Sequence, residues 1–186
     1  MSKLKEKCGI VGIYGKDLPV SKLAFFSLFA LQHRGQEASG IVTNDGKKFR
    51  THRGAGLVSQ VYTEKIIKNL TGYIGIGHNR YSTSKGGALN HAQPVVNNNA
   101  SFALAHNGNL PSVQALENFL SLKKILKKNR NDSELIADAI DFYIKEGNTL
   151  PKSVEKVYPL ITGAFSLVMM NKDTLVAVRD TYGMRP

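Results

Sequence analysis

The chain has 186 residues, of which 42% are hydrophobic and 21% are charged. This length and composition predict one ordinary globular domain and exclude disordered and fibrous proteins. The longest apolar stretches, 23–31 and 161–170, fall short of the roughly 18 residues that a membrane-spanning helix requires, so we expect no membrane partner. The first seven residues carry three lysines but lead into no secretory signal, and we therefore expect a cytoplasmic protein.

Basic residues outnumber acidic ones by 25 to 14, which gives a formal net charge of +11. Such an excess raises a nucleic-acid-binding module as one alternative. The densest basic cluster, 123–130, follows an apolar-periodic stretch, where cations complement the negative end of a helix dipole. Because the cluster has no interleaved aromatic residues, we interpret it as a solvated helix end and expect no nucleic-acid partner.

The apolar pattern predicts strands and helices in runs. In chain order they are a strand at 8–14, a buried helix at 20–33, strands at 40–43 and 48–53, a short helix at 63–70, strands at 73–78 and 102–106, helices at 112–128 and 133–145, and strands at 164–170 and 174–179. The segment 44–46 predicts a hairpin, and 107–109 a sharp turn. This order favours an α+β fold with layered sheets over an alternating α/β fold.

Cys8 is the single cysteine, which excludes an intrachain disulfide and a multi-cysteine metal site. The five histidines do not pair at helical spacing, so we expect no metal. A lone cysteine is often just a small buried side chain. As a nucleophile, its thiol of pKa near 8.5 would need a base. Removal of Met1 to Lys7 would place the α-amine of Cys8 beside its own thiol, where the amine can relay the proton.

Polar residues at the ends of predicted strands are suited to complete such a site. Acyl transfer from an amide requires an oxyanion hole, for which the Asn107 side chain and the Gly108 backbone N–H are suitable donors. Arg80 is suited to hold the carboxylate of an amino acid, and Asp132 its ammonium group. Simpler structural explanations remain open at this stage, namely a tight turn at Asn107 and a helix cap beside Asp132.

Eight segments extend over nearly the whole chain: CGIVGIYG from Cys8, LQHRGQEASGI from Leu31, GIGHNRYST from Gly75, NHAQPV from Asn90, AHNGNL from Ala105, NDSELIA from Asn131, GAFSLV from Gly163 and RDTYGMRP from Arg179. Together, and in this order, they resemble the class II, or N-terminal-nucleophile, glutamine amidotransferases. The resemblance implies a four-layer αββα sandwich of the N-terminal-nucleophile hydrolase type. It further implies that residues 1–7 are a propeptide and that 8–186 form the glutamine amidotransferase domain.

In that family the cysteine attacks the side-chain amide of L-glutamine, ammonia leaves, and water releases glutamate from the γ-glutamyl thioester. The resemblance assigns the attack to Cys8. It assigns the oxyanion hole to Asn107 and Gly108, the substrate carboxylate to Arg80 and the α-amino group to Asp132. By the same resemblance Arg34 supports the cysteine end of the pocket. Tyr81 and Thr83 belong to a loop, 80–91, that closes over glutamine, and His106 is a strand-end support rather than a general base.

The stretches LQHRGQE and HNGNL are most similar to the branch of the family that supplies ammonia for phosphoribosylamine synthesis in the first step of de novo purine biosynthesis. Glucosamine-6-phosphate synthase represents the alternative branch, and an inactive regulatory domain of the same fold is a further alternative. In the purine branch a phosphoribosyltransferase domain follows, which we expect to lie outside this chain. The resemblance assigns Mg²⁺ with phosphoribosyl pyrophosphate, and in some members an iron–sulfur cluster, to that other half. It implies no cofactor in this chain and a homo-oligomer at full length.

Overall fold

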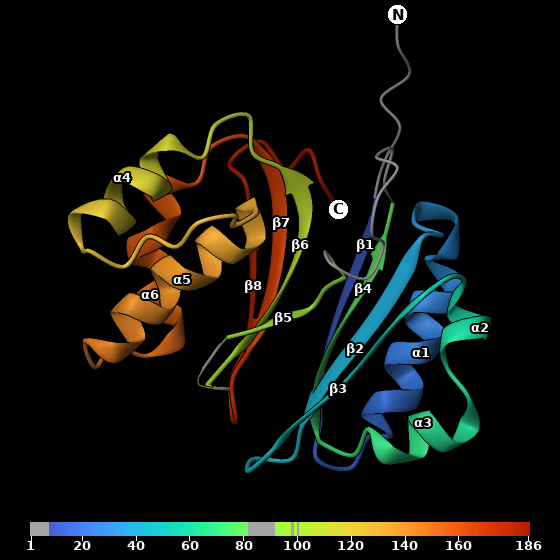
Figure 1. The fold of residues 1–186 in the computed structure, drawn as a ribbon. Helices are drawn as coiled ribbons and strands as arrows, with labels where there is room; N and C mark the ends of the chain where they lie inside the picture. Colours follow the sequence, from blue (N-terminus) through green and yellow to red (C-terminus); the bar gives the residue numbers. More distant parts are fainter. Residues whose placement is uncertain (1–7, 82–91, 98, 100) are drawn as a thin grey trace, which may run out of the picture.

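Two antiparallel sheets lie face to face between two layers of helices (Figure 1). The computed structural model describes residues 8–81, 92–97, 99 and 101–186. The first sheet has the strand order β1-β4-β2-β3, and the second has the order β5-β6-β7-β8. The strands are β1 (Gly9–Tyr14), β2 (Ala38–Asn44), β3 (Phe49–Ala55), β4 (Ile74–Arg80), β5 (Val95–Val96), β6 (Ala103–Asn109), β7 (Ala164–Met170) and β8 (Leu175–Arg179).

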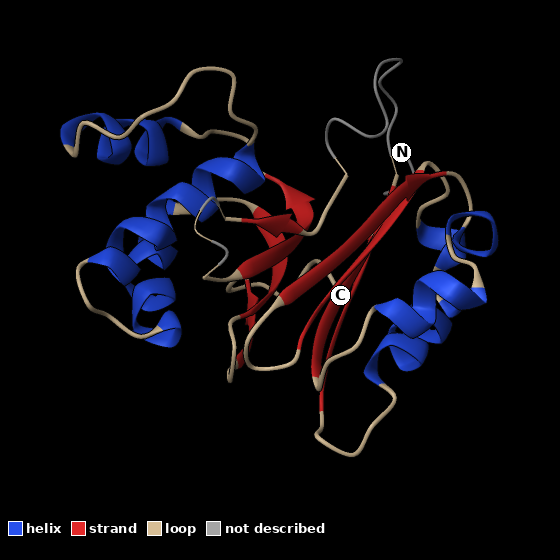
Figure 2. Ribbon diagram, turned by 60° about the horizontal axis from the view of Figure 1, so that its bottom comes forward, coloured by secondary structure: helices blue, strands red, loops and turns tan. Residues whose placement is uncertain are grey.

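Helices cover the outer face of each sheet, as Figure 2 shows from a second side. Those on the first sheet are α1 (Val20–Ala30), the 3₁₀ helix η1 (Gln32–Arg34), α2 (Val58–Val61) and α3 (Glu64–Asn69). Those on the second are α4 (Gln114–Leu122), α5 (Asp132–Lys145), α6 (Leu150–Val157) and the 3₁₀ helix η2 (Tyr158–Leu160). The predicted four-layer αββα sandwich is therefore confirmed. Within the described ranges, no helix is both long and apolar enough to cross a membrane.

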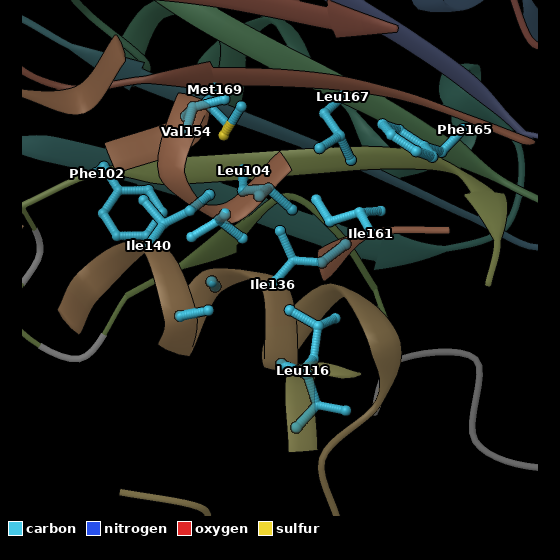
Figure 3. Close-up of a cluster of buried hydrophobic side chains, with 14 of the residues drawn as sticks. Phe102, Leu104, Leu116, Ile136, Ile140, Val154, Ile161, Phe165, Leu167 and Met169 are labelled. Atoms are coloured by element: carbon cyan, nitrogen blue, oxygen red, sulfur yellow. The ribbon is translucent and has the colours of Figure 1, made fainter. Parts of the chain in front are cut away.

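Three apolar layers hold the sandwich together. Leu28 of α1 packs with Ile41 of β2 beneath the first helical layer. Between the sheets, Ile76 of β4 belongs to the same cluster as Ala105 of β6. The largest cluster lies between the second sheet and helices α4, α5 and α6, where Ile136 and Ile140 of α5 face strand residues (Figure 3). Burial of such side chains stabilises by about 1.5–3 kcal/mol each, so each layer fixes the relative positions of its elements.

The predicted hairpin between β2 and β3 forms as expected. Asn44 accepts a hydrogen bond from the backbone N–H of Gly46 at 2.6 Å, and Gly46 has a φ of 89°. Asp45 accepts from the N–H groups of Lys47 and Lys48 at 3.0 and 2.8 Å. Short polar side chains that bond back to the local backbone, followed by a glycine at positive φ, close the turn and set the register in which Asn44 faces Phe49.

Several predicted boundaries were wrong. The buried helix ends at Ala30 and passes into η1, three residues before the predicted end at His33. The helix predicted at 112–128 ends at Leu122, and Lys124 and Asn129 adopt positive φ values of 57° and 59°, which an α-helix does not accommodate. The basic cluster therefore lies in the connection after α4 rather than in its last turns.

Several features of the second half were not predicted correctly, among them the short strand β5 and the 3₁₀ helix η2. Helix α6 was missed, although Thr149 caps it by accepting from the N–H of Lys152 at 3.4 Å and Pro151 lies in its first turn. Residues 107–109 were predicted as a turn but continue β6, because Asn107 pairs with Ser166 and Gly108 with Phe165 of β7. The neighbouring strand thus overrides the local turn preference of an Asn-Gly pair.

Candidate active site

Cys8 lies immediately before β1, and its backbone is held from both sides by Arg34 of η1. The N–H of Cys8 donates to the carbonyl of Arg34 at 3.1 Å, and Nε of Arg34 donates to the carbonyl of Cys8 at 2.8 Å. Cys8 has a φ of 64°, a left-handed conformation that is costly for a residue with a Cβ. Because Arg34 is only 7% exposed, this reciprocal pair fixes where the strand begins.

The thiol of Cys8 lies against the end of β4. Its Sγ is 3.5 Å from the backbone N of Tyr81, which donates to it, and 3.9 Å from the carbonyl O of Tyr81. Burial raises the pKa of the thiol, while the Tyr81 backbone hydrogen bond and then the positive charges of Arg80, Arg185 and Arg34 act to lower it. Burial has the larger effect, so the pKa of the thiol is raised overall. A base is therefore needed to form the thiolate, which the N–H of Tyr81 and the arginines would then stabilise.

Arg80 is the last residue of β4 and is oriented by Glu37. Its Nε lies 3.3 Å from Oε2 of Glu37, with the two side chains 18% and 25% exposed. The carbonyl of Arg80 accepts from the N–H of Glu37 at 3.1 Å. Gly35 makes this approach possible, since a Cβ there would lie 2.7 Å from the carbonyl carbon of Arg80. The segment from Gly35 to Glu37 therefore contacts the end of β4 closely, through both backbone and side chain.

Asn107 and Gly108 lie near the end of β6, in the second sheet. The side chain of Asn107 is 1% exposed, and its Nδ2 donates to the carbonyl of Pro186 at 3.1 Å. A Cβ at Gly108 would lie 2.6 Å from the carbonyl O of Ala164 and 2.7 Å from Nε2 of His106. Only glycine fits this position, so the backbone of residue 108 is packed closely against β7 and the His106 ring.

Asp132 is the first residue of α5 and lies beside His106. Its Oδ1 accepts from the N–H of Ser133 at 2.7 Å, and its Oδ2 is 3.7 Å from Nδ1 of His106. The preceding residue, Asn131, forms the capping box with Glu134 that the sequence indicated. The cap therefore belongs to Asn131, and the carboxylate of Asp132, 27% exposed, is left beside the end of β6.

Two buried histidines connect the sheets behind these residues. Nε2 of His78 in β4 lies 3.2 Å from the carbonyl of His106 in β6. Burial lowers the pKa of His78 to about 3, and burial also lowers the pKa of His106 against the opposing effect of Asp132. Both imidazoles are therefore neutral near pH 7. The ring of His106 lies between Gly108 and Ser133, near the end of β6.

The last residues of the chain run back to the same end of the sandwich, where the C-terminus lies between the two sheets (Figure 1). Ser166 of β7 donates to the carbonyl of Arg185 at 2.7 Å. The positive charge of Arg185 acts to lower the pKa of both Cys8 and His106, which lie on different sheets. Arg185 is thus a neighbour of both halves of the site.

The structure brings the sequence-predicted residues into two groups. The first group lies at one end of the first sheet and consists of Cys8, Arg34, Arg80 and Tyr81. The second group lies around His106, at the second sheet and helix α5, and consists of Asn107, Gly108 and Asp132. The segment Met1 to Lys7, Thr83 and most of the loop 80–91 lie outside the described residues.

Sequence reasoning gave no role to Gln93 or Arg185, and it considered Glu37 only as a candidate residue that could form a salt bridge at a helix end. Glu37 orients Arg80, Gln93 contacts both His106 and Ser133, and Arg185 lies near the thiol. Each of the three belongs to one of the eight segments that carry the family resemblance. That membership is the sequence signal by which these residues could have been found. Among the residues described, no three His, Cys, Asp or Glu side chains are grouped so that they could hold a metal ion.

Comparison with known proteins shows the family of this chain. The chain belongs to the glutamine amidotransferase domain family, whose model matches residues 78–186. It is 41% identical over 182 residues to an amidophosphoribosyltransferase of Methanocaldococcus jannaschii, with 96% of this chain and 39% of that protein covered. The chain thus spans little more than a third of the length of this relative.

Two solved structures share the fold over most of this chain. One is described as the allosteric regulatory enzyme of purine biosynthesis, with a TM-score of 0.82 and 32% identity over 95% of this chain and 38% of that one. The other is the glutamine phosphoribosylpyrophosphate amidotransferase of B. subtilis, with a TM-score of 0.79, 32% identity and the same coverage.

Proposed function

We propose that this chain is the glutaminase part of an amidophosphoribosyltransferase, and that it hydrolyses L-glutamine to glutamate and ammonia through Cys8. The observation that carries the proposal is the setting of the Cys8 thiol. It lies at the beginning of β1, 3.5 Å from the N–H of Tyr81 and within the field of three arginines. A half-buried thiol held in this way, in a member of the glutamine amidotransferase domain family, is the expected nucleophile.

The first chemical step forms a bond between Sγ of Cys8 and the side-chain carbonyl carbon of glutamine. The thiol proton passes to the α-amine of Cys8, which is free once residues 1–7 are removed, and then to the departing nitrogen. The C–N bond breaks and ammonia leaves. Water then attacks the thioester, which releases glutamate and restores the thiol. The carbonyl of Arg34, 3.1 Å from the Cys8 nitrogen, holds that nitrogen in place.

Asn107 and Gly108 are assigned to the oxyanion of this reaction. The amide of Asn107 carries two N–H donors, of which one is directed to the carbonyl of Pro186 and the other can serve the oxyanion. Arg80, oriented by Glu37, binds the substrate carboxylate, and Asp132 binds the α-amino group. Tyr81 and Thr83 complete the binding loop, and Arg34 supports the nucleophile.

The role within the whole protein is proposed from the relatives. The ammonia would be used for phosphoribosylamine synthesis by a phosphoribosyltransferase domain outside residues 8–186, in a cytoplasmic enzyme that is a homo-oligomer at full length. Mg²⁺ with phosphoribosyl pyrophosphate, and any iron–sulfur cluster, would belong to that domain, and no cofactor is assigned to this chain. The 41% identity to an amidophosphoribosyltransferase favours this branch over glucosamine-6-phosphate synthase.

The test combines intact mass with alkylation by a glutamine-like diazoketone. We expect the mass to show loss of Met1 to Lys7 and then one adduct that maps to Cys8. Before alkylation the trimmed chain should release glutamate from glutamine, and this release should fall to background in Cys8→Ala, because no other cysteine is present. Cys8→Ala that still releases glutamate would contradict the proposal, as would a trimmed chain that forms no adduct.

A chain that retains residues 1–7 should be inactive, because the nitrogen of Cys8 is then an amide and no base. Activity after trimming to Cys8 would support the assigned base. Tight glutamine binding without turnover in the trimmed chain would favour the inactive regulatory domain instead. Binding to DNA that weakens steeply with salt would favour the nucleic-acid alternative.

A further inference from the structure

Gln93 joins the two elements that carry Asn107 and Asp132. Its Oε1 accepts from the backbone N–H of His106 at 2.7 Å, and its Nε2 donates to Oγ of Ser133 at 3.1 Å. His106 directly precedes Asn107 in β6, and Ser133 directly follows Asp132 in α5. One side-chain amide therefore bridges the strand of the proposed oxyanion hole and the helix of the proposed ammonium site.

The backbone of Gln93 is held by the first sheet. A Cβ at Gly40 of β2 would overlap the carbonyl oxygen of Gln93, so the two backbones approach as closely as only glycine permits. Nη1 of Arg53 in β3 donates to the carbonyl of the neighbouring residue, Ala92, at 3.0 Å. Gln93 is thus anchored on one sheet while its side chain contacts the other.

The chemistry of the network requires a side chain with both a donor and an acceptor. The N–H of His106 can only donate, so the oxygen of the Gln93 amide must face it and the NH₂ group must face Ser133. Oγ of Ser133 also lies 3.0 Å from Nδ1 of His106 and 3.3 Å from Oδ1 of Asp132. The hydroxyl oxygen of Ser133 accepts a hydrogen bond from Nε2 of Gln93. The single hydroxyl proton of Ser133 can be donated either to Nδ1 of His106 or to Oδ1 of Asp132.

We propose that Gln93 is a positioning residue of the glutaminase site, which acts by holding Asn107 and Asp132 at a fixed separation through His106 and Ser133. This inference rests on the proposed function. It predicts that loss of the Gln93 amide impairs the recognition and turnover of glutamine while the thiol of Cys8 stays accessible and intact.

The first experiment compares Gln93→Met with the parent protein, each verified by mass to begin at Cys8. We expect kcat/KM for glutamine to fall roughly ten- to hundredfold, because small displacements of catalytic groups have effects of that size. Alkylation of Cys8 by the glutamine-like diazoketone should slow in parallel, whereas alkylation by iodoacetamide should keep its rate. Gln114→Met is the matched control, since Gln114 is an exposed side chain that bonds only locally to Asn118 in α4.

Two further variants separate positioning from folding. Ser133→Ala removes the partner of Nε2 and should act in the same direction. Combined with Gln93→Met it should add little, because both changes break one network. Gln93→Glu keeps an acceptor for His106 but loses the donor to Ser133, so it should retain more activity than Gln93→Met. Should Gln93→Met fail to fold, Ser133→Ala alone decides the matter.

The outcomes are distinguishable. If Gln93→Met has the kcat/KM of the parent protein, the role of Gln93 is overturned and the glutaminase function is left intact. If Gln93→Met does not fold, an unchanged kcat/KM in Ser133→Ala leads to the same conclusion. Equal slowing of both alkylation reactions also overturns the role of Gln93, because the thiol itself is then disturbed. A parent protein that begins at Cys8 but neither hydrolyses glutamine nor reacts with the diazoketone overturns the proposed function and this inference with it.

Discussion

The two halves of the candidate site are held in place by different means. On the first sheet, Cys8 bonds to the backbone of Arg34 and of Tyr81 and also accepts from the side chain of Arg34. On the second, buried side chains position Asn107 and Asp132, through Gln93, His106 and Ser133. Close backbone contacts fail when the backbone is displaced, whereas a buried polar network fails when any one of its side chains is lost.

The largest effect is expected where the backbone itself is displaced. In Gly35→Ala the new Cβ would meet the carbonyl groups of Asn79 and Arg80 at 2.7–2.8 Å, and these cannot rotate away. The end of β4 should move with Tyr81, which lowers glutamine hydrolysis about a hundredfold or more and costs about 1–3 kcal/mol of stability. Activity and urea unfolding measure the two effects.

Gly12→Ala is the control for Gly35→Ala. Its Cβ would meet only side-chain atoms, the nearest being Cγ1 of Val168 at 3.0 Å, away from the site. It should cost stability with little change in the activity of the folded fraction. If Gly35→Ala retained full activity, the close approach at β4 would have no part in positioning the thiol.

On the second sheet, Asp132→Asn should chiefly affect substrate binding. An asparagine can still accept from the N–H of Ser133 but carries no charge for an ammonium group. The KM for glutamine should rise about tenfold or more, with a smaller change in kcat.

Asp138→Asn, on the same helix, is the control for Asp132→Asn, because Asp138 pairs with Lys127 and Arg130 instead. Steady-state kinetics decide the matter. An unchanged KM in Asp132→Asn would remove Asp132 from the substrate site.

The connection between the sheets should be sensitive to acid. The folded pKa of His78 is lowered to about 3, so between that value and about 6.5 the unfolded chain binds more protons and stability rises with pH. From pH 6.5 down to pH 5 the loss attributable to His78 is up to about 2 kcal/mol.

Urea unfolding across this range measures the acid sensitivity. His78→Gln should reduce the slope, with the remainder due to His106, whose pKa is also lowered by burial. His33→Gln, at an exposed position in η1, controls for loss of an imidazole. An unchanged slope in His78→Gln would show that His78 is not held neutral in the folded state.

The smallest effect is expected in α6, an outer helix that carries none of the proposed site residues. Thr149→Ala removes the cap of α6 and should cost about 1 kcal/mol of stability. Glutamine hydrolysis by the folded protein should not change. A fall in kcat/KM would mean that α6 takes part in positioning the site.

The sequence by itself determined the fold class and most strands, and it is the basis for proposing Cys8 as the nucleophile. Alternating apolar runs and the Asn44–Gly46 hairpin act locally, so their structure follows from neighbouring residues. The single cysteine and the ordered segments around it predicted the family to which the chain belongs.

Only the tertiary structure decided how the remaining residues are used. The pair Asn107 and Gly108 looks locally like a turn, but pairing with β7 makes it strand. Gln93 lies 13 residues from His106 and 40 from Ser133, and no local pattern records that all three meet. Such contacts depend on how two sheets pack across long separations in sequence, which the three apolar layers establish and short-range propensities do not.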